Sequence, residues 1–108
     1  MTLYLSMMIE RHLSIDPVHP GEILREDILP ALASSKTAVA DALGISRQTL
    51  YDILNERQPV TAEWAVRCGK LFGNGAGFWV NLQCMYDLAL AERTVDVSTI
   101  PTIAAHTG

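Results

Sequence analysis

The feature that most constrains this chain is a spacing pattern that runs from Lys36 to Ile53. Counted from Lys36, apolar residues fall at the fourth, eighth, tenth, fifteenth and eighteenth positions, a small residue at the fifth and glycine at the ninth: Val39, Leu43, Ile45, Leu50, Ile53, Ala40 and Gly44. A small fifth residue lets two helices cross closely, and glycine can adopt the left-handed conformation of a sharp turn. The pattern predicts a helix-turn-helix, whose second helix presents its N-terminal residues to the DNA major groove.

Apolar periodicity and capping residues predict an all-α fold of five helices in one domain, at 19–29, 35–44, 46–55, 59–73 and 74–94. Ser35, Ser46 and Thr61 are the expected N-caps, and Gly44 and Gly73 the expected stops. Pro30, directly after the first of these segments, is expected to limit or kink that helix.

The two ends of the chain are expected to be short extended segments outside the helical domain. We divide the sequence into an N-terminal extension (1–17), a helix-turn-helix domain (18–93) and a C-terminal tail (94–108). The tail alternates Val95 and Val97, which suits a short strand if it finds a partner and a disordered tail otherwise. The N-terminus is a poor signal peptide, and no stretch approaches the roughly 18 apolar residues of a membrane span, so we expect a cytoplasmic protein.

The charge of the chain argues against indiscriminate binding of nucleic acid. Eight basic residues stand against 12 acidic ones, for a formal net charge of −4. The charge is uneven, because 36–70 carries five basic and four acidic residues, or +1, and the rest carries −5. Specific binding of nucleic acid by a small positively charged face therefore remains open.

The first turns of the third helix carry the candidate base-reading residues Arg47, Gln48, Tyr51 and Thr49. Arginine suits a bidentate contact with guanine and glutamine one with adenine, each worth about 1–3 kcal/mol of discrimination. Tyr51 could meet a thymine methyl or a phosphate, or pack against a neighbouring helix, and Thr49 is expected to turn towards the backbone or the core edge. The role of Asp52 is undecided. Its carboxylate would repel phosphate unless it accepts a hydrogen bond from a cytosine amino group or pairs with an arginine.

Candidate phosphate-binding residues flank the same helix: Lys36, Thr37, Ser46, Asn55 and Arg57. Lys36, Thr37 and Ser46 lie at helix N-termini, which favour anions. For Ser46 the cap alone is a sufficient explanation, Asn55 can cap the helix end, and Arg57 can simply be exposed.

The fifth helix carries a broad apolar arc that includes Phe78, Trp79, Leu82, Met85 and Tyr86. This arc is wider than one small monomer usually covers, so we expect part of it to be core and part to be a dimer interface, and we assign these five residues as the candidate interface.

No catalytic or metal-binding pattern is present in the sequence. The histidines and cysteines (His12, His19, His106, Cys68 and Cys84) show no metal-ligand spacing, and there is no phosphate-binding loop or nucleophile elbow. We expect no metal, no cofactor, no small-molecule substrate and no enzymatic activity, and we expect both cysteines to be reduced and to lie in the apolar faces of their helices.

Four pieces of the chain carry a resemblance to a known family: "HPGEIL", "SRQTLYDILN", "PVTAEWAVRCGKLFG" and "FWVNLQCMYDL". With these motifs the chain resembles the HigA-type antitoxins, a branch of the lambda-repressor-like helix-turn-helix proteins, over residues 18–93. The resemblance implies a homodimer that binds double-stranded operator DNA and represses its own operon. It also implies capture of a cognate toxin, usually a RelE-like ribonuclease that cuts messenger RNA on the ribosome.

Two alternatives remain open at the level of sequence. One is a stand-alone helix-turn-helix transcriptional regulator without a toxin partner. The other is a protein-interaction module whose helix-turn-helix has lost DNA contact, which the net charge of −4 suggests.

Overall fold

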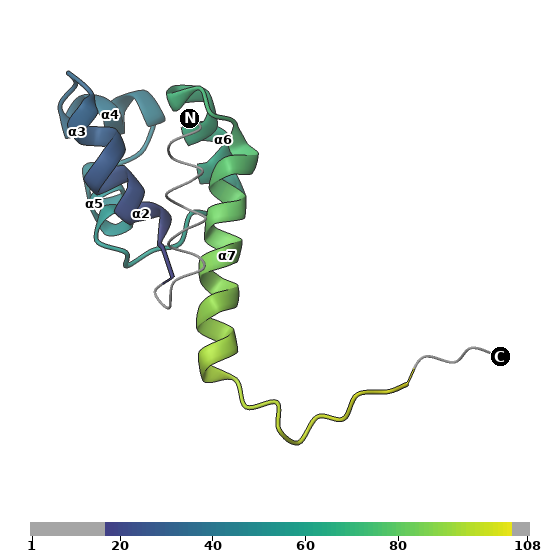
Figure 1. The fold of residues 1–108 in the computed structure, drawn as a ribbon. Helices are drawn as coiled ribbons and strands as arrows, with labels where there is room; N and C mark the ends of the chain where they lie inside the picture. Colours follow the sequence, from purple (N-terminus) through teal and green to yellow (C-terminus); the bar gives the residue numbers. More distant parts are fainter. Residues whose placement is uncertain (1–16, 105–108) are drawn as a thin grey trace.

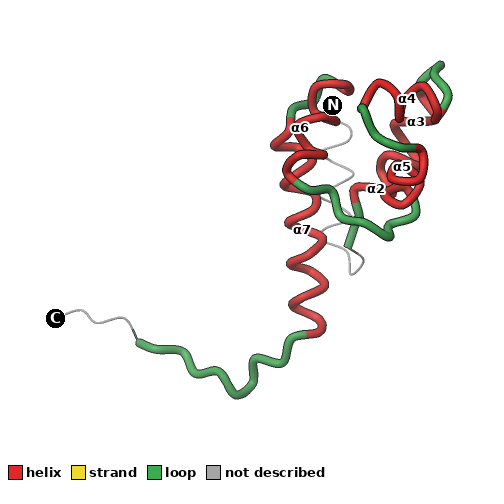
Figure 2. The backbone as a smooth tube through the Cα atoms, turned by 180° about the vertical axis from the view of Figure 1, so that it is seen from behind, coloured by secondary structure: helices red, strands yellow, loops and turns green. Residues whose placement is uncertain are grey.

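The computed structural model describes residues 17–104, which form an all-helical body with no strand in that range (Figures 1 and 2). In chain order the elements are α2 (Pro20–Ile23), the π-helical turn η1 (Leu24–Ile28), α3 (Leu29–Ala31), α4 (Lys36–Leu43), α5 (Arg47–Leu54), α6 (Ala62–Phe72) and α7 (Ala76–Thr94). Because α2, η1 and α3 follow without a break, the described chain has the five helical segments that the sequence predicts. The N-terminal extension lies outside the described residues, except for Pro17.

Pro30 shapes the first helical segment in two ways. The Leu29 N–H donates to the carbonyl of Leu24, five residues back, which widens the turn immediately before the proline. Pro30 itself has no N–H to donate, and the helix ends at Ala31. The expectation that Pro30 limits this helix is confirmed.

The packing of α4 on α5 follows the spacing pattern. The patterned helix residues are at most 4% exposed: Val39, Ala40, Leu43, Leu50 and Ile53. Gly44 adopts the left-handed conformation at φ 73°, and Ile45 packs half-buried against the core. The helix-turn-helix is therefore present as predicted.

The predicted caps of α4, α5 and α6 all form. Ser35, Ser46 and Thr61 accept hydrogen bonds from the backbone N–H groups of Ala38, Thr49 and Trp64, at 3.1, 3.1 and 3.3 Å. Each cap satisfies a backbone donor that a helix N-terminus otherwise leaves without a partner.

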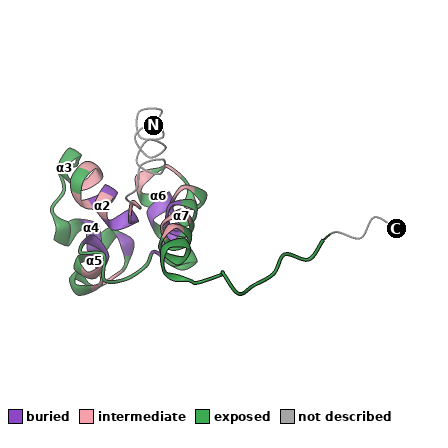
Figure 3. Cartoon of the chain, turned by 60° about the horizontal axis from the view of Figure 1, so that its bottom comes forward, coloured by how far each residue is buried: buried purple, intermediate pink, exposed green. Residues whose placement is uncertain are grey.

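The second half of the core lies between α6 and α7, where Figure 3 shows buried residues facing the interior. Trp79 is 0% exposed and Leu82 is 2% exposed, and the Trp79 indole donates to Asn74 Oδ1 at 2.9 Å. The assignment of Trp79 and Leu82 to a dimer interface is therefore wrong, because both fill the core of the monomer. Phe78, also assigned there, is half-buried and packs edge-on against Trp79.

The two cysteines have different environments. Cys68 is fully buried in α6, and burial raises the pKa of its thiol to about 12. Cys84 is exposed on α7, so unlike Cys68 it is not part of the core.

The C-terminal half of α7 extends beyond the helical body, and residues 95–104 continue away from it (Figure 1). Every described residue from Leu90 onward is exposed. The tail contains a turn in which the Ile100 N–H donates to the Val97 carbonyl at 3.0 Å, and no strand forms in its described part.

The start of α2 is pressed against the last turn of α5. His19 caps α2 by accepting the Gly21 N–H at 2.9 Å, and Pro20 occupies the first turn, where no N–H is needed. A Cβ atom at Gly21 would overlap the backbone carbonyl oxygen of Ile53. We call this close approach of Gly21 to Ile53 the α2–α5 seat.

Replacing Gly21 by alanine should destabilise the protein. The added methyl group forces α2 away from the α2–α5 seat, and overpacking of this kind costs about 3 kcal/mol. Gly77→Ala is the matched control, because Gly77 lies in α7 with open space around it, and alanine there should stabilise by about 0.5–1 kcal/mol. Urea unfolding of both variants measures the difference, and equal stabilities would contradict the seat.

The imidazole of His19 should make stability depend on pH. His19 is 4% exposed and lies edge-on against the Tyr86 ring at 4.9 Å. Burial lowers its pKa below the usual 6.5, although the carboxylates of Glu56 and Asp87 act in the opposite direction. Protonation is thus easier in the unfolded chain, so this stabilisation is complete above pH 6.5 and is lost as the pH falls below it.

The control for this effect is His19→Asn, because asparagine keeps the capping acceptor but takes up no proton. Thermal unfolding between pH 5 and 7.5 should show a shallower pH dependence for His19→Asn than for the unmodified protein. Parallel curves would remove His19 from this role.

Candidate nucleic-acid interface

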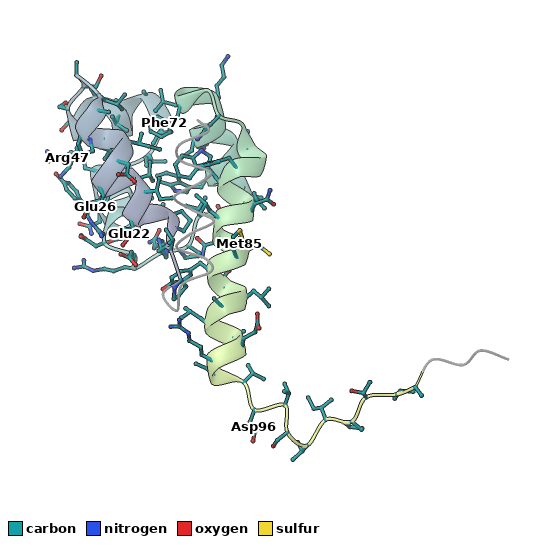
Figure 4. All side chains as sticks on the ribbon, in the orientation of Figure 1. Glu22, Glu26, Arg47, Phe72, Met85 and Asp96 are labelled. Atoms are coloured by element: carbon teal, nitrogen blue, oxygen red, sulfur yellow. The ribbon has the colours of Figure 1, made fainter. Side chains whose placement is uncertain are left out.

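The start of α5 presents two polar side chains to solvent. Arg47 and Gln48 are exposed in the first turn, and Figure 4 shows Arg47 at the edge of the body opposite α7. The Arg47 side chain makes no hydrogen bond or ion pair with another described residue. Its guanidinium, with five N–H donors, is therefore available to an external acceptor.

Tyr51 and Lys36 come together next to this turn. The Lys36 ammonium lies 5.4 Å from the centroid of the Tyr51 ring, which is a cation–π contact between α4 and α5. Tyr51 is 38% exposed, so one part of the ring supports Lys36 and another faces solvent. The contact brings the first residue of α4 to the exposed side of α5.

Gln48 and Asp52 form a second pair along α5. The Gln48 side-chain amide donates to Asp52 Oδ1 at 2.9 Å. Asp52 also accepts from Gln58 Nε2 at 3.4 Å and lies 3.8 Å from Arg57 Nη1. Asp52 therefore pairs with an arginine, which was one of the two possibilities open from the sequence. We call Arg47, Gln48, Tyr51 and Asp52 the outer face of α5.

Thr49 belongs to the cap of α5. It is half-buried, and its hydroxyl lies 2.9 Å from Ser46 Oγ, while its backbone N–H donates to the same oxygen. Both hydroxyls are used within the cap, so the base-reading role of Thr49 and the phosphate role of Ser46 stay predictions.

The remaining candidate phosphate-binding residues are exposed at helix ends. Thr37 is the second residue of α4, and Asn55 is the C-terminal cap position of α5. The Arg57 side chain is 68% exposed. Arg57 contacts the outer face of α5 through Asp52.

Two arginines that sequence reasoning did not single out hold the ends of the helix-turn-helix. Arg67 Nη1 donates to the Leu43 carbonyl at 2.8 Å, and Arg25 Nη1 donates to the Leu54 carbonyl at 2.6 Å. Each satisfies a carbonyl that a helix C-terminus leaves open. Arg67 also pairs with Glu63 at 3.1 Å, and this i, i+4 spacing was the one local signal for it.

Gln83 is a third residue that the sequence did not single out. It is 7% exposed, and its Oε1 accepts the Val60 N–H at 2.7 Å while its Nε2 donates to Asp87 at 2.9 Å. This hydrogen bond ties the loop that follows α5 to α7.

Metal and membrane features were also sought within residues 17–104. No group of three or more histidine, cysteine or acidic side chains in this range could hold a metal ion. No helix in the described part of the chain is both long and apolar enough to cross a bilayer.

Comparisons with known proteins identify relatives of this geometry. No protein-family model matches the chain. Virulence-associated protein I of Dichelobacter nodosus is 42% identical over 76 residues, which is 70% of each chain. The Pseudomonas aeruginosa antitoxin HigA, solved with the higBA promoter, is 39% identical with a TM-score of 0.67 and matches 75% of this chain and 97% of its own. The antitoxin GraA, solved in complex with its operator, is 36% identical with a TM-score of 0.73, over 86% and 94%.

These matches cover 70–86% of this chain. They confirm the resemblance and the fold that the sequence predicts. The chain belongs to the HigA-type antitoxins, a family of helix-turn-helix proteins.

Proposed function

We propose that this protein is the antitoxin of a type II toxin-antitoxin module and a sequence-specific DNA-binding repressor of its own operon. The observation that carries the proposal is the outer face of α5, where Arg47 has no internal partner while the other end of α5 is held by the α2–α5 seat. Promoter and operator complexes of the relatives HigA and GraA support it.

The mechanism is docking without chemical change. In a dimer, two copies of α5 enter successive major grooves of a palindromic operator, about 34 Å apart. Arg47 and Gln48 reach base edges, guanine and adenine being their best partners. Lys36, Thr37, Ser46, Asn55 and Arg57 contact phosphates and fix the register of the protein on the duplex.

Arg47→Ala should weaken operator binding by about 1–3 kcal/mol and flatten base preference at one position of each half-site. Lys36→Ala is the comparison, because loss of a phosphate contact should weaken all sequences alike and lower the salt slope by about one. Gel-shift titrations on the protein's own promoter at several salt concentrations, with a binding-site selection for each variant, measure both effects. Unchanged base preference in Arg47→Ala would remove Arg47 from base reading.

The proposed dimer interface is an apolar groove along α7. The apolar lining residues on α7 recur on one helical face, at Val80, Cys84, Leu88 and Ala91. Gln83 and Asp87 also line the groove, and Val60 and Ala62 line it from outside α7. Val80 is 40% exposed and Leu88 is 55% exposed. The groove reaches Ala91 in the protruding end of α7, where every described residue from Leu90 onward is exposed. A second copy of the same helix supplies a matching apolar face.

Leu88→Glu should convert the dimer to a folded monomer, because the side chain is more than half exposed in one chain but would be buried between two. Sedimentation equilibrium measures the oligomeric state, and the apparent operator affinity should fall with it. Val66→Glu is the control, since Val66 is 62% exposed on α6, away from the α7 groove. Dissociation by Val66→Glu alone would place the interface on α6.

The cognate toxin is proposed to be a RelE-like ribonuclease that cuts messenger RNA. The support is membership of the HigA-type family, and the test is co-expression with any small basic reading frame found next to the gene. Co-purification and relief of growth arrest are the expected results. Specific promoter binding without either result would favour the stand-alone transcriptional regulator.

A further inference from the structure

The outer face of α5 contains a carboxylate where DNA presents phosphate, and its contacts suggest why. Asp52 stands one helical turn after Gln48, and its side chain is 19% exposed. A carboxylate this close to the DNA backbone costs affinity through charge repulsion. The presence of Asp52 is explained if its carboxylate orients the side chain that it contacts.

That residue is Gln48, whose side-chain amide has two chemically different ends. An ionised carboxylate only accepts hydrogen bonds, so Asp52 can pair with the amide nitrogen of Gln48 and not with its oxygen. The hydrogen bond at 2.9 Å therefore fixes which way round the amide stands. The Gln48 oxygen and its second N–H remain for an external partner.

Asp52 is itself held from the other side. Gln58 Nε2 donates to its second carboxylate oxygen at 3.4 Å, and Arg57 Nη1 lies 3.8 Å from the first. Both come from the loop after α5, so the carboxylate is fixed between a helix turn and a loop. The nearby guanidinium also offsets part of its charge.

We infer that Asp52 is a positioning residue for base selection: it orients the Gln48 amide so that a fixed donor–acceptor pattern faces the major groove. This inference rests on the proposed DNA-binding function and deepens it. Asp52 acts through Gln48 and contacts no base. With the amide free to rotate by 180°, Gln48 would present either pattern, and its preference between bases would be lost.

The test compares base preference in Gln48→Ala, Asp52→Asn and the double variant, by binding-site selection with the full-length protein. Asparagine can both donate and accept, so it no longer fixes the Gln48 amide. Asp52→Asn should lower the preference at the base pair read by Gln48 by about tenfold. Affinity for all sequences should rise, because a negative charge is removed. In the Gln48→Ala background, Asp52→Asn should change no base preference.

Two control variants separate this role from charge and from folding. Asp41→Asn removes the same charge from exposed α4, where Asp41 has no side-chain contact with Gln48, and should leave base preference unchanged. Asp52→Glu keeps an acceptor-only group and should retain the sense of the Gln48 preference. Asp52→Ala, which removes the acceptor without adding a donor, decides the question if Asp52→Asn fails to fold.

The outcomes are distinguishable. Unchanged preference in Asp52→Asn, with a clear effect of Gln48→Ala, would overturn the inference and leave the proposed function intact. A change at a base pair different from the one that Gln48 reads would also overturn it, because Asp52 would then read a base directly. Absence of any preferred sequence for the unmodified protein would overturn the proposed function and this inference together.

Discussion

The close contact between Gly21 and the Ile53 carbonyl is the constraint on which the rest of the helix-turn-helix depends. Helix α5 has only eight residues, far too few to be stable alone in water. Its shape is therefore set by its neighbours. The α2–α5 seat and the Arg25 hydrogen bond to Leu54 hold its last turn, and the Ser46 cap holds its first. These contacts therefore determine where the side chains on the outer face of α5 lie.

Buried polar groups and Arg47 on the outer face of α5 differ in whether they have hydrogen-bond partners within the body. Within the described residues, no buried side-chain nitrogen or oxygen lacks a hydrogen-bond partner. The buried His19 and Gln83 both serve the backbone, one as a cap and one as an anchor for the Val60 loop. The Arg47 side chain, in contrast, makes no hydrogen bond to another described residue. The free hydrogen-bond donors of Arg47 thus lie at the start of a helix that the rest of the body holds in place. Recognition by hydrogen bonds requires donors held in this way.

Local signals in the sequence predicted the helix-turn-helix, its caps and the Gly44 turn, because each depends on residues within a few positions of one another. The contacts of Arg25, Arg67 and Gln83 could not be predicted, since their partners lie 29, 24 and 23 residues away. The buried face of α7 was misjudged at Trp79 and Leu82 because apolar residues lie all around that helix. Periodicity then identifies a helix without identifying its inner side. The Asp52 contact with Gln48 follows helical spacing, but only the structure shows that the contact forms.

The use of Arg25 and Arg67 at helix ends has a consequence for how such a protein would find its site on a chromosome. Their guanidinium groups are paired with carbonyl groups at helix ends and with the carboxylates of Glu56 and Glu63, on a chain of net charge −4. Non-specific attraction to DNA grows with the number of phosphates neutralised, so bulk chromosome would retain such a protein only briefly. Little of the protein would be sequestered along irrelevant DNA, and the free concentration would follow synthesis and loss closely. A small autorepressor built in this way would respond quickly when its own level falls.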